Sequence, residues 1–226
     1  MNKVSIVIPV KNSGEQIKHT INSILKSTDY NYEIILIDGM STDGTSEVLD
    51  IYAKQYKQIK VFHVETNGIA SAINYGIKKS GNNDVYLTQD DVIFNRLYGR
   101  DWLELIVKAS QDEKIGLITT LKGGGISGKD YIEGLPWAGT WSLFIPRRTI
   151  NKIGLFDENF DPGYGDDIDY SYRVQKEGLI LAQIDFWVDH HRLGQHLDNS
   201  EKSEELKKEH SKYFRKKFGI GECNDN

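Results

Sequence analysis

The chain has 226 residues, of which 38% are hydrophobic and 27% are charged, and its formal net charge is −5 at pH 7. This composition is typical of a globular protein with a full core, and the acidic balance gives no general case for nucleic-acid binding. No apolar run approaches the ~20 residues of a membrane-spanning helix. The single cysteine, Cys223, cannot form an internal disulfide, so nothing indicates an oxidising compartment. We therefore expect a cytoplasmic protein.

Short apolar runs alternate with segments of helical period in the first half of the chain. Strands are predicted at 4–10, 33–38, 60–65 and 84–91. Helices are predicted between them, from about residue 17, from about 42 to 56, and over 69–80. Near-continuous apolar strands joined by helices indicate an α/β protein with a mostly parallel, Rossmann-like sheet between two helical layers. Because ligands bind beyond the carboxyl ends of strands in such sheets, the polar residues that follow three of these strands predict a site.

The second half of the chain is less regular. Its predicted elements are a helix over 101–112, strands near 115–121, 138–146 and 179–191, a helix over 166–177 and a helix over 201–218. The glycines of residues 122–136 predict a mobile loop of the kind that acts as a lid. We find no internal repeat, Pro-rich linker or clear domain boundary, so the chain is expected to form one domain.

A dense cluster of acids stands out around the stretch GYGDDIDYSYR, residues 163–173. Six of the thirteen residues from 157 to 169 are acidic: Asp157, Glu158, Asp161, Asp166, Asp167 and Asp169. Like charges this close raise one another's pKa values, so the repulsion needs an offset. Helix capping and an i, i+4 pair with Arg173 would account for one or two of the acids. An EF-hand is excluded because Pro162 and Ile168 occupy its required glycine and glutamate positions.

A bound cation would explain more of this chemistry. Asp90 and Asp91 lie at the end of one predicted strand, and His190 and His191 lie at the end of another. Carboxylates with an imidazole suit Mn²⁺ or Mg²⁺, which also bind phosphate oxygens. Each pair alone has an equally good structural explanation, but together in this topology they favour a metal site.

Five segments, in order, resemble the family 2 glycosyltransferases with the GT-A fold: VSIVIPVKN, LIDGMSTDGT, ETNGIASAINYGI, TQDD and IGLFDENFDPGYGDDIDYSYRVQKEG. Single pieces such as TQDD are weak signals, whereas five in order are a strong one. The resemblance implies an inverting, nucleotide-sugar-dependent enzyme of glycan or polysaccharide biosynthesis. It divides one domain, residues 1–226, into a nucleotide-sugar-binding half (1–95), an acceptor and catalytic half (96–200), and a C-terminal helix and tail (201–226).

The resemblance also implies roles for donor-binding residues. Pro9 and Asp38 would lie at the base and ribose of the nucleotide, and Asn74 belongs to the helix that packs under the donor sugar. The usual pattern has a second acid where this chain has Gly39, which leaves the choice of nucleotide open. The DxD element corresponds to residues 89–91, with Asp91 as metal ligand and Asp90 as a contact to ribose or metal.

The same resemblance assigns the catalytic side of the site. Asp167 corresponds to the general base, and Asp166 would position the acceptor or cap the helix. A histidine at the end of the next strand would complete the Mn²⁺ or Mg²⁺ site. The residue count from Asp167 favours His191, with His190 as the alternative.

Two tryptophans, Trp137 and Trp141, flank the expected acceptor side. An indole face there could stack on a sugar ring, and core packing is an equally good explanation.

Other functions and one further partner are compatible with parts of this sequence. A sugar-1-phosphate nucleotidyltransferase would also bind a nucleotide and a metal, but its glycine-rich phosphate loop is absent. A non-catalytic carbohydrate-binding protein would not need the three acids Asp90, Asp91 and Asp167. The basic residues of 201–218 around Tyr213 and Phe214 also suggest weak peripheral contact with the inner membrane face.

Overall fold

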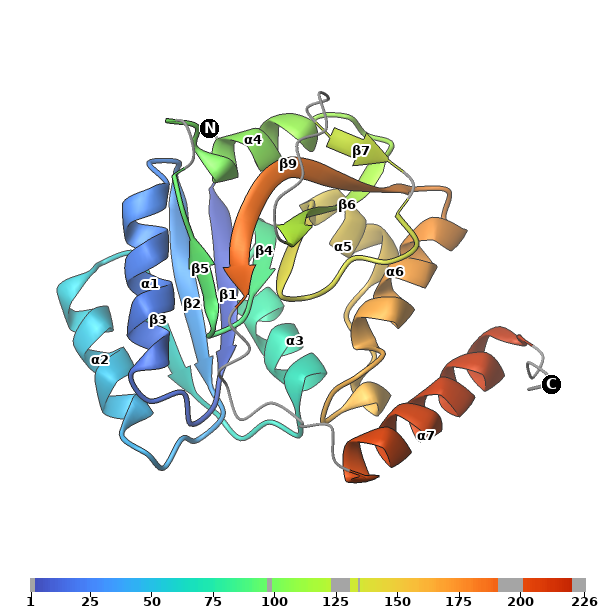
Figure 1. Ribbon diagram of the computed structural model, residues 1–226, viewed down its shortest axis with the longest axis horizontal. Helices are drawn as coiled ribbons and strands as arrows, with labels where there is room; N and C mark the ends of the chain where they lie inside the picture. The colour runs from blue at the N-terminus through green and yellow to red at the C-terminus, as the bar shows by residue number, and fades with distance from the viewer. Residues whose placement is uncertain (1–2, 97–98, 123–130, 134, 191–200, 221–226) are drawn as a thin grey trace.

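The apolar runs of the sequence form the strands of one sheet in a computed structural model, which describes residues 3–96, 99–122, 131–133, 135–190 and 201–220 (Figure 1). Its strands are β1 (Val4–Val10), β2 (Tyr32–Asp38), β3 (Ile59–His63), β4 (Asp84–Thr88), β5 (Val92–Phe94), β6 (Ile115–Lys122), β7 (Tyr131–Glu133), β8 (Ser142–Ile145) and β9 (Ile180–His190). The core of the predicted lid, residues 123–130, and the predicted ligand His191 lie outside the described residues.

The helices follow the predicted periodicity, except that residues 147–153, where no helix was predicted, also form one. They are α1 (Gln16–Ser27), α2 (Thr45–Gln55), α3 (Ile69–Lys79), α4 (Trp102–Ala109), α5 (Arg147–Ile153), α6 (Asp166–Lys176) and α7 (Glu201–Phe218), with a 3-10 turn at Glu158–Phe160. In α1, the buried Ile17, Ile21 and Ile24 recur on one face as expected. The helix α4 begins at Asp101, whose side chain accepts hydrogen bonds from two backbone N–H groups of the first turn.

The sheet is parallel in its first half and mixed in its second. The strand order is β3-β2-β1-β4-β8-β6-β9-β5, with β7 paired to β9. Strands β1 to β4 pair in parallel, which confirms the Rossmann-like expectation for this half. Strand β8 lies antiparallel between β4 and β6, and β5 pairs antiparallel with β9. The strand predicted over 84–91 ends earlier, at Thr88, and the chain returns to the sheet as β5 from Val92.

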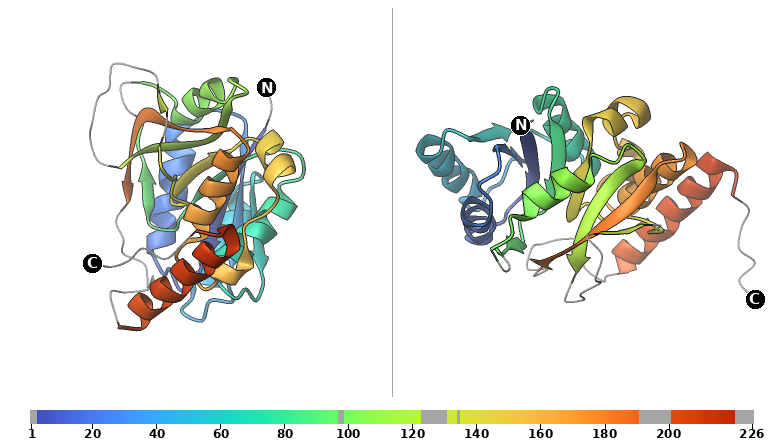
Figure 2. Two further views of the ribbon diagram at one scale, coloured as in Figure 1. Left: turned by 90° about the vertical axis from the view of Figure 1, so that its right-hand side faces the viewer. Right: turned by 90° about the horizontal axis from the view of Figure 1, so that it is seen from above.

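Helices cover both faces of the sheet, as Figure 2 shows. Alternate residues of β1 enter different cores, since Ile6 and Ile8 pack with α1 and α4 whereas Val7 packs with α3 and α6. Close packing needs a small residue where α3 crosses β1: a Cβ on Gly76 would lie 2.2 Å from Val7 Cγ1. The two-sided burial fixes the sheet and leaves the carboxyl ends of β1, β2 and β4 at one edge.

The C-terminal helix α7 packs against the acid-rich segment and α6. The Tyr213 ring contacts Phe160, and the Phe214 ring contacts Tyr172, with ring centroids 5.2 and 5.3 Å apart. Both aromatic residues that the sequence offered for membrane contact therefore pack on the protein itself. Contact of α7 with a membrane surface stays a prediction, and it would depend on the charged face of the helix. Within the described ranges, the structure has no helix with the length and apolar character needed to cross a bilayer.

Candidate functional site

A cavity of about 1360 Å³ opens at the carboxyl edge of the parallel strands. It is lined by the loop after β1, the loop before α3, the end of β4, and residues of α6, β9 and α7. The loops after β1 and β2 are tied together, because Asn12 N–H donates to Ser41 Oγ (2.9 Å) and Thr42 N–H donates to Asn12 Oδ1 (2.8 Å). The site thus forms where the predicted strand ends converge.

Asp166 and Asp167 enter this cavity from the first turn of α6. The helix begins after a sharp turn in which Tyr164 and Gly165 have φ values of 70° and 92°. Gly165 suits this left-handed conformation, and a Cβ there would also lie 3.1 Å from the Phe160 ring. The positive end of the helix dipole faces the two carboxylates, which lowers the cost of holding them together. Both line the cavity.

The other four acids of the cluster have partners. Asp161 accepts bonds from the backbone N–H groups of Ala70 and Ser71 at the start of α3, and Glu158 accepts from Asn74 Nδ2. Asp157 and Asp169 are bound by other side chains: Lys217 Nζ to both, Tyr213 Oη to Asp157, and Arg173 Nε to Asp169 at 2.7 Å. The pair of Asp169 and Arg173 was expected to be exposed, but the Asp169 side chain is fully buried.

The remaining pair, Asp166 and Asp167, is not balanced by a cation of the described residues. The Oδ2 atom of Asp166 is buried without a hydrogen-bond partner among them. Burial, followed by repulsion from Asp167, raises the pKa of Asp166 to about 8, and burial raises that of Asp167 to about 6. Because the carboxyls interact, these values describe the pair as a unit.

Burial of this pair is expected to make folding stability depend on pH. Between about pH 4 and 8 the folded state keeps a proton that the unfolded chain has lost, so the free energy of unfolding falls as the pH rises. Asp166→Asn cannot titrate, and we expect it to be more stable than the wild type by about 1 kcal/mol or more at pH 8. At pH 4 the two proteins should differ little. Urea unfolding at both pH values measures this, and a constant difference would contradict the assignment.

We expect Lys217 to provide most of the positive charge that offsets the repulsion among the other acids of the cluster. Burial acts to raise the pKa of Asp157, but bonds from Lys217, Asn159 and Tyr213 outweigh it and hold that pKa well below its ordinary value. The Lys217 side chain is 24% exposed and Asp169 keeps Arg173, so Lys217→Met should cost about 1–3 kcal/mol of unfolding free energy at pH 7. The loss of unfolding free energy should become smaller below about pH 4. The unfolded chain binds protons there, so the depressed pKa of Asp157 no longer stabilises the folded state. Urea titration beside Lys216→Met, an exposed neighbour expected to cost under about 0.5 kcal/mol, tests the assignment; equal losses would contradict it.

The donor groups for a divalent cation meet at the end of β9. Asp91 is fully buried, lines the cavity, and has its Oδ1 atom 3.3 Å from His190 Nε2. The His190 ring stacks on Trp141, with centroids 5.7 Å apart, which fixes its orientation. A carboxylate and an imidazole, with room in the cavity for phosphate oxygens, fit Mn²⁺ or Mg²⁺. The described residues include no cluster of three or more metal-ligating side chains, so substrate oxygens would complete the set.

Asp38 and Asn74, two of the predicted donor ligands, have other partners. Both Asp38 oxygens accept two bonds each, Oδ1 from Ser41 N–H and Oγ, and Oδ2 from Ser46 Oγ and His63 Nδ1. Asn74 donates to Phe156 O and Glu158 and accepts from Phe156 N–H. Neither side chain lines the cavity. Asp38 thus holds the loop after β2 and Asn74 braces the acid-rich segment, and their expected contact with a donor stays a prediction.

Of the other predicted site residues, some line the cavity and others are packed away from it. Pro9 and Trp137 line the cavity, and the Trp137 side chain is exposed at its mouth. Asp90 is buried outside the lining, and its backbone oxygen accepts a bond from Thr20 Oγ1. Trp141 packs against His190 and the core rather than lining the cavity. Its position supports the packing explanation over direct sugar stacking.

Sequence reasoning missed the contribution of α7. Lys207, His210, Ser211 and Phe214 line the cavity beside the acid pair. Their i, i+3, i+4, i+7 spacing marked one face of a helix, but nothing local to the sequence showed what that face would contact.

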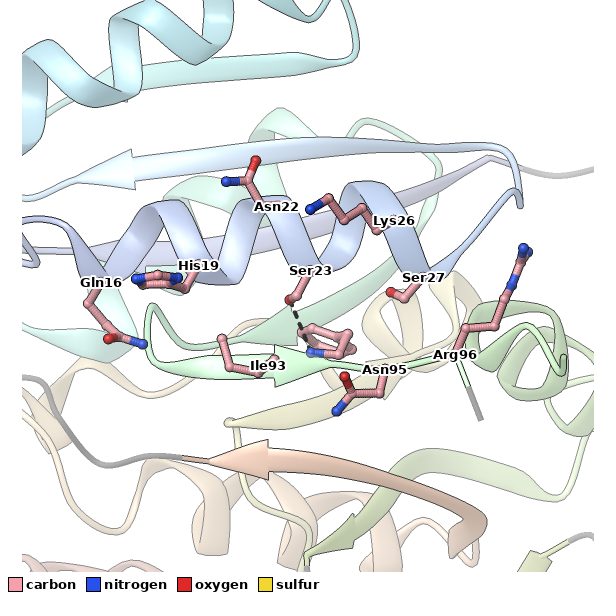
Figure 3. A pocket seen from close by; sticks show the side chains of 10 residues that line it. Gln16, His19, Asn22, Ser23, Lys26, Ser27, Ile93, Asn95 and Arg96 are labelled. Atoms are coloured by element: carbon pink, nitrogen blue, oxygen red, sulfur yellow. Dashed lines mark hydrogen bonds between the residues drawn. The ribbon is translucent and has the colours of Figure 1, made fainter. Parts of the chain in front are cut away.

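A second, smaller groove of about 580 Å³ lies between α1 and β5, where Figure 3 shows one face of the helix opposite the strand. It is lined by amides, hydroxyls, the apolar Ile93 and Phe94, and the basic side chains His19, Lys26 and Arg96, and none of the described residues that line it is acidic. Ser23 Oγ accepts a bond from Phe94 N–H and so protects the edge of β5. Without a carboxylate to act as base or metal ligand, this groove does not match the predicted chemistry.

Comparison with known proteins agrees with this geometry. Residues 5–164 match the family described as glycosyl transferase family 2. An uncharacterized glycosyltransferase of Rickettsia felis is 37% identical over 175 residues, which cover 71% of this chain and 27% of that protein. The chain spans about a quarter of the length of three uncharacterized Rickettsia glycosyltransferases that it matches.

Solved structures show the same fold at low sequence identity. The mannosyltransferase PcManGT from Pyrobaculum calidifontis, in complex with GDP-Man and Mn²⁺, has a TM-score of 0.75 at 17% identity and covers 98% of this chain and 65% of its own. GalNAc-T7 with UDP, GalNAc and Mn²⁺ has a TM-score of 0.73 at 18% identity, and the match covers 97% of this chain and 57% of GalNAc-T7. These likenesses support the GT-A fold.

Proposed function

The chain belongs to glycosyl transferase family 2, and from this membership we propose that it moves a sugar from a nucleotide-diphosphate sugar to an acceptor hydroxyl with inversion at C1. The observation that carries the proposal is the acid pair, Asp166 and Asp167, held in one cavity with Asp91 and His190. The four neighbouring acids are held by other parts of the fold, whereas Asp166 and Asp167 lie at the cavity without a balancing cation among the described residues, which favours a functional role. A raised pKa in a cavity is typical of a catalytic carboxyl.

Asp167 acts as the general base in this proposal. Its carboxylate takes the proton from an acceptor hydroxyl while that oxygen forms a bond to C1 of the donor sugar. The bond from C1 to the diphosphate oxygen breaks on the opposite face, and its electron pair leaves with the nucleoside diphosphate. A pKa near 6 suits a base that is mostly ionised at pH 7 and still accepts a proton readily. No covalent intermediate is required.

Asp91 and His190 would hold the divalent cation, which supplies Lewis-acid stabilisation of the leaving diphosphate when bound. The two structural neighbours contain Mn²⁺ together with a nucleotide or nucleotide sugar, which supports a similar requirement here. His191, the ligand favoured from the sequence with His190 as its alternative, lies outside the described residues.

The loops after β1 and β2 form the donor side of the proposed site. Pro9, Lys11 and Asn12 line the cavity next to Gly39, where a Cβ would lie 3.4 Å from Lys11 Cδ. The missing side chain at Gly39 leaves room for Lys11 against the nucleotide. The two neighbours bind UDP and GDP-Man respectively, so the nucleotide has to be found by experiment.

A two-stage assay tests this function. Thermal shift with UDP, GDP, dTDP and CDP, each with and without Mn²⁺, identifies the nucleotide. The matching radiolabelled nucleotide sugars are then incubated with glycan acceptors. Transfer of the label supports the proposal. Release of pyrophosphate from a nucleoside triphosphate and a sugar 1-phosphate would instead indicate a nucleotidyltransferase, and glycan binding without turnover would indicate a carbohydrate-binding protein.

A further inference from the structure

The helix α7 lies outside the matched region, residues 5–164, yet it forms one wall of the cavity. Figure 1 shows it beside α6, on the opposite flank of the site from β2 and β3. The nucleotide-side loops follow β1 and β2. The face of α7 that reaches the cavity therefore lies on the side away from the proposed nucleotide position.

Three contacts fix α7 relative to the acid pair. Tyr164 O accepts a hydrogen bond from His210 Nδ1 at 2.8 Å, which holds the turn just before Asp166. Because a carbonyl oxygen can only accept, Nδ1 carries the proton. Tyr213 and Lys217 hold Asp157 and Asp169 on either side of the pair. The wall and the proposed base are thus parts of one packed unit.

The cavity has room for two substrates. Pockets for a single small ligand are typically ~300–1,000 Å³, and this one is about 1360 Å³. At its α7 end, Phe214 contributes an aromatic surface and Ser211 an exposed hydroxyl. The Lys207 ammonium lies 4.9 Å from the centroid of the Tyr164 ring, with Glu204 as its ion partner. Aromatic surface beside short hydrogen-bonding groups suits a sugar ring, which has apolar C–H faces and polar edges.

We propose that α7 forms the acceptor-side wall of the active site, with Ser211 facing the bound acceptor glycan. The inference rests on the proposed glycosyl transfer and adds to it the residues that select the acceptor. Enlarging Ser211 would place bulk in the acceptor position without reaching the nucleotide loops. Specificity is readily altered by such an introduced clash.

The test compares Ser211→Trp with Lys212→Trp, which places the same indole at the next, exposed residue that does not line the cavity. We expect Ser211→Trp to raise the acceptor KM about tenfold or more relative to the donor KM. Lys212→Trp should behave as wild type. Ser211→Leu, a smaller enlargement, should give an intermediate acceptor KM.

The possible outcomes separate this inference from the function on which it rests. An unchanged acceptor KM in Ser211→Trp would overturn the acceptor wall while leaving glycosyl transfer intact. An equal rise in donor KM would also overturn it, because the α7 end would then belong to the donor. Wild-type protein that transfers no sugar from any donor would instead refute the proposed function, and the acceptor wall with it.

Discussion

Asp167→Asn is expected to lower the rate of sugar transfer by about 10²–10⁴-fold, the usual loss when general-base assistance is removed. Asparagine keeps the size of the side chain but cannot accept the acceptor proton. Donor binding should survive, because the proposed metal ligands are Asp91 and His190 on other elements. The stability of the variant should be at least that of the wild type at pH 7, because the substitution removes a buried carboxyl with a raised pKa and asparagine is well tolerated at a helix start. Single-turnover kinetics with a saturating donor measure the rate, and calorimetry measures donor binding.

The pH profile provides an independent check of the same assignment. Transfer by the wild type should fall as the pH drops below about 6, because the Asp167 carboxylate becomes protonated. Asp166→Asn and Asp169→Asn should each cost less than Asp167→Asn. Near-wild-type turnover of Asp167→Asn would refute its role as base. A loss explained wholly by weaker donor binding would make Asp167 a ligand, and the base would then have to be sought at Asp166.

Asp91→Asn is expected to remove the metal-dependent part of nucleotide-diphosphate binding. The carboxylate is buried at the cavity beside His190, and an amide oxygen is a weaker, uncharged ligand for Mn²⁺. Outer-shell changes alone typically cost 10–100-fold in metal affinity, so loss of a direct ligand should cost at least about that much. Titration calorimetry with the nucleotide found by thermal shift, with and without Mn²⁺, gives the two affinities. Only the affinity in Mn²⁺ should fall strongly.

Asp90→Asn is the matched control for that measurement. Asp90 is the adjacent acid in the sequence and is buried outside the cavity lining, so its substitution should change the Mn²⁺ effect less. Equal nucleotide affinity of wild type and Asp91→Asn in both conditions would refute the metal-ligand role of Asp91. A larger effect at Asp90 would move the metal site to that residue.

Local sequence determined the elements and the location of the site. Apolar strands and one-sided helices are properties of neighbouring residues, so β1, β2, α3, α6 and α7 were found to within one or two residues. The carboxyl-edge position of Asp91 and Asp167 followed from the parallel topology that those patterns imply. The chemical roles of these two residues stay predictions, which the substitutions Asp91→Asn and Asp167→Asn test.

Only the tertiary structure decided which polar side chains are used to build the fold. Asp38 and Asn74 form hydrogen bonds with neighbouring loops, and Asp90 is buried outside the cavity lining. The balance of the acid cluster depends on Lys217, which is 48 residues from Asp169 in the chain and meets it only when α7 packs against α6. Local patterns do not encode such pairings, because they depend on where separate elements dock. The same docking brings Ser211 to the cavity, where Asp166 and Asp167 lie together without a balancing cation among the described residues.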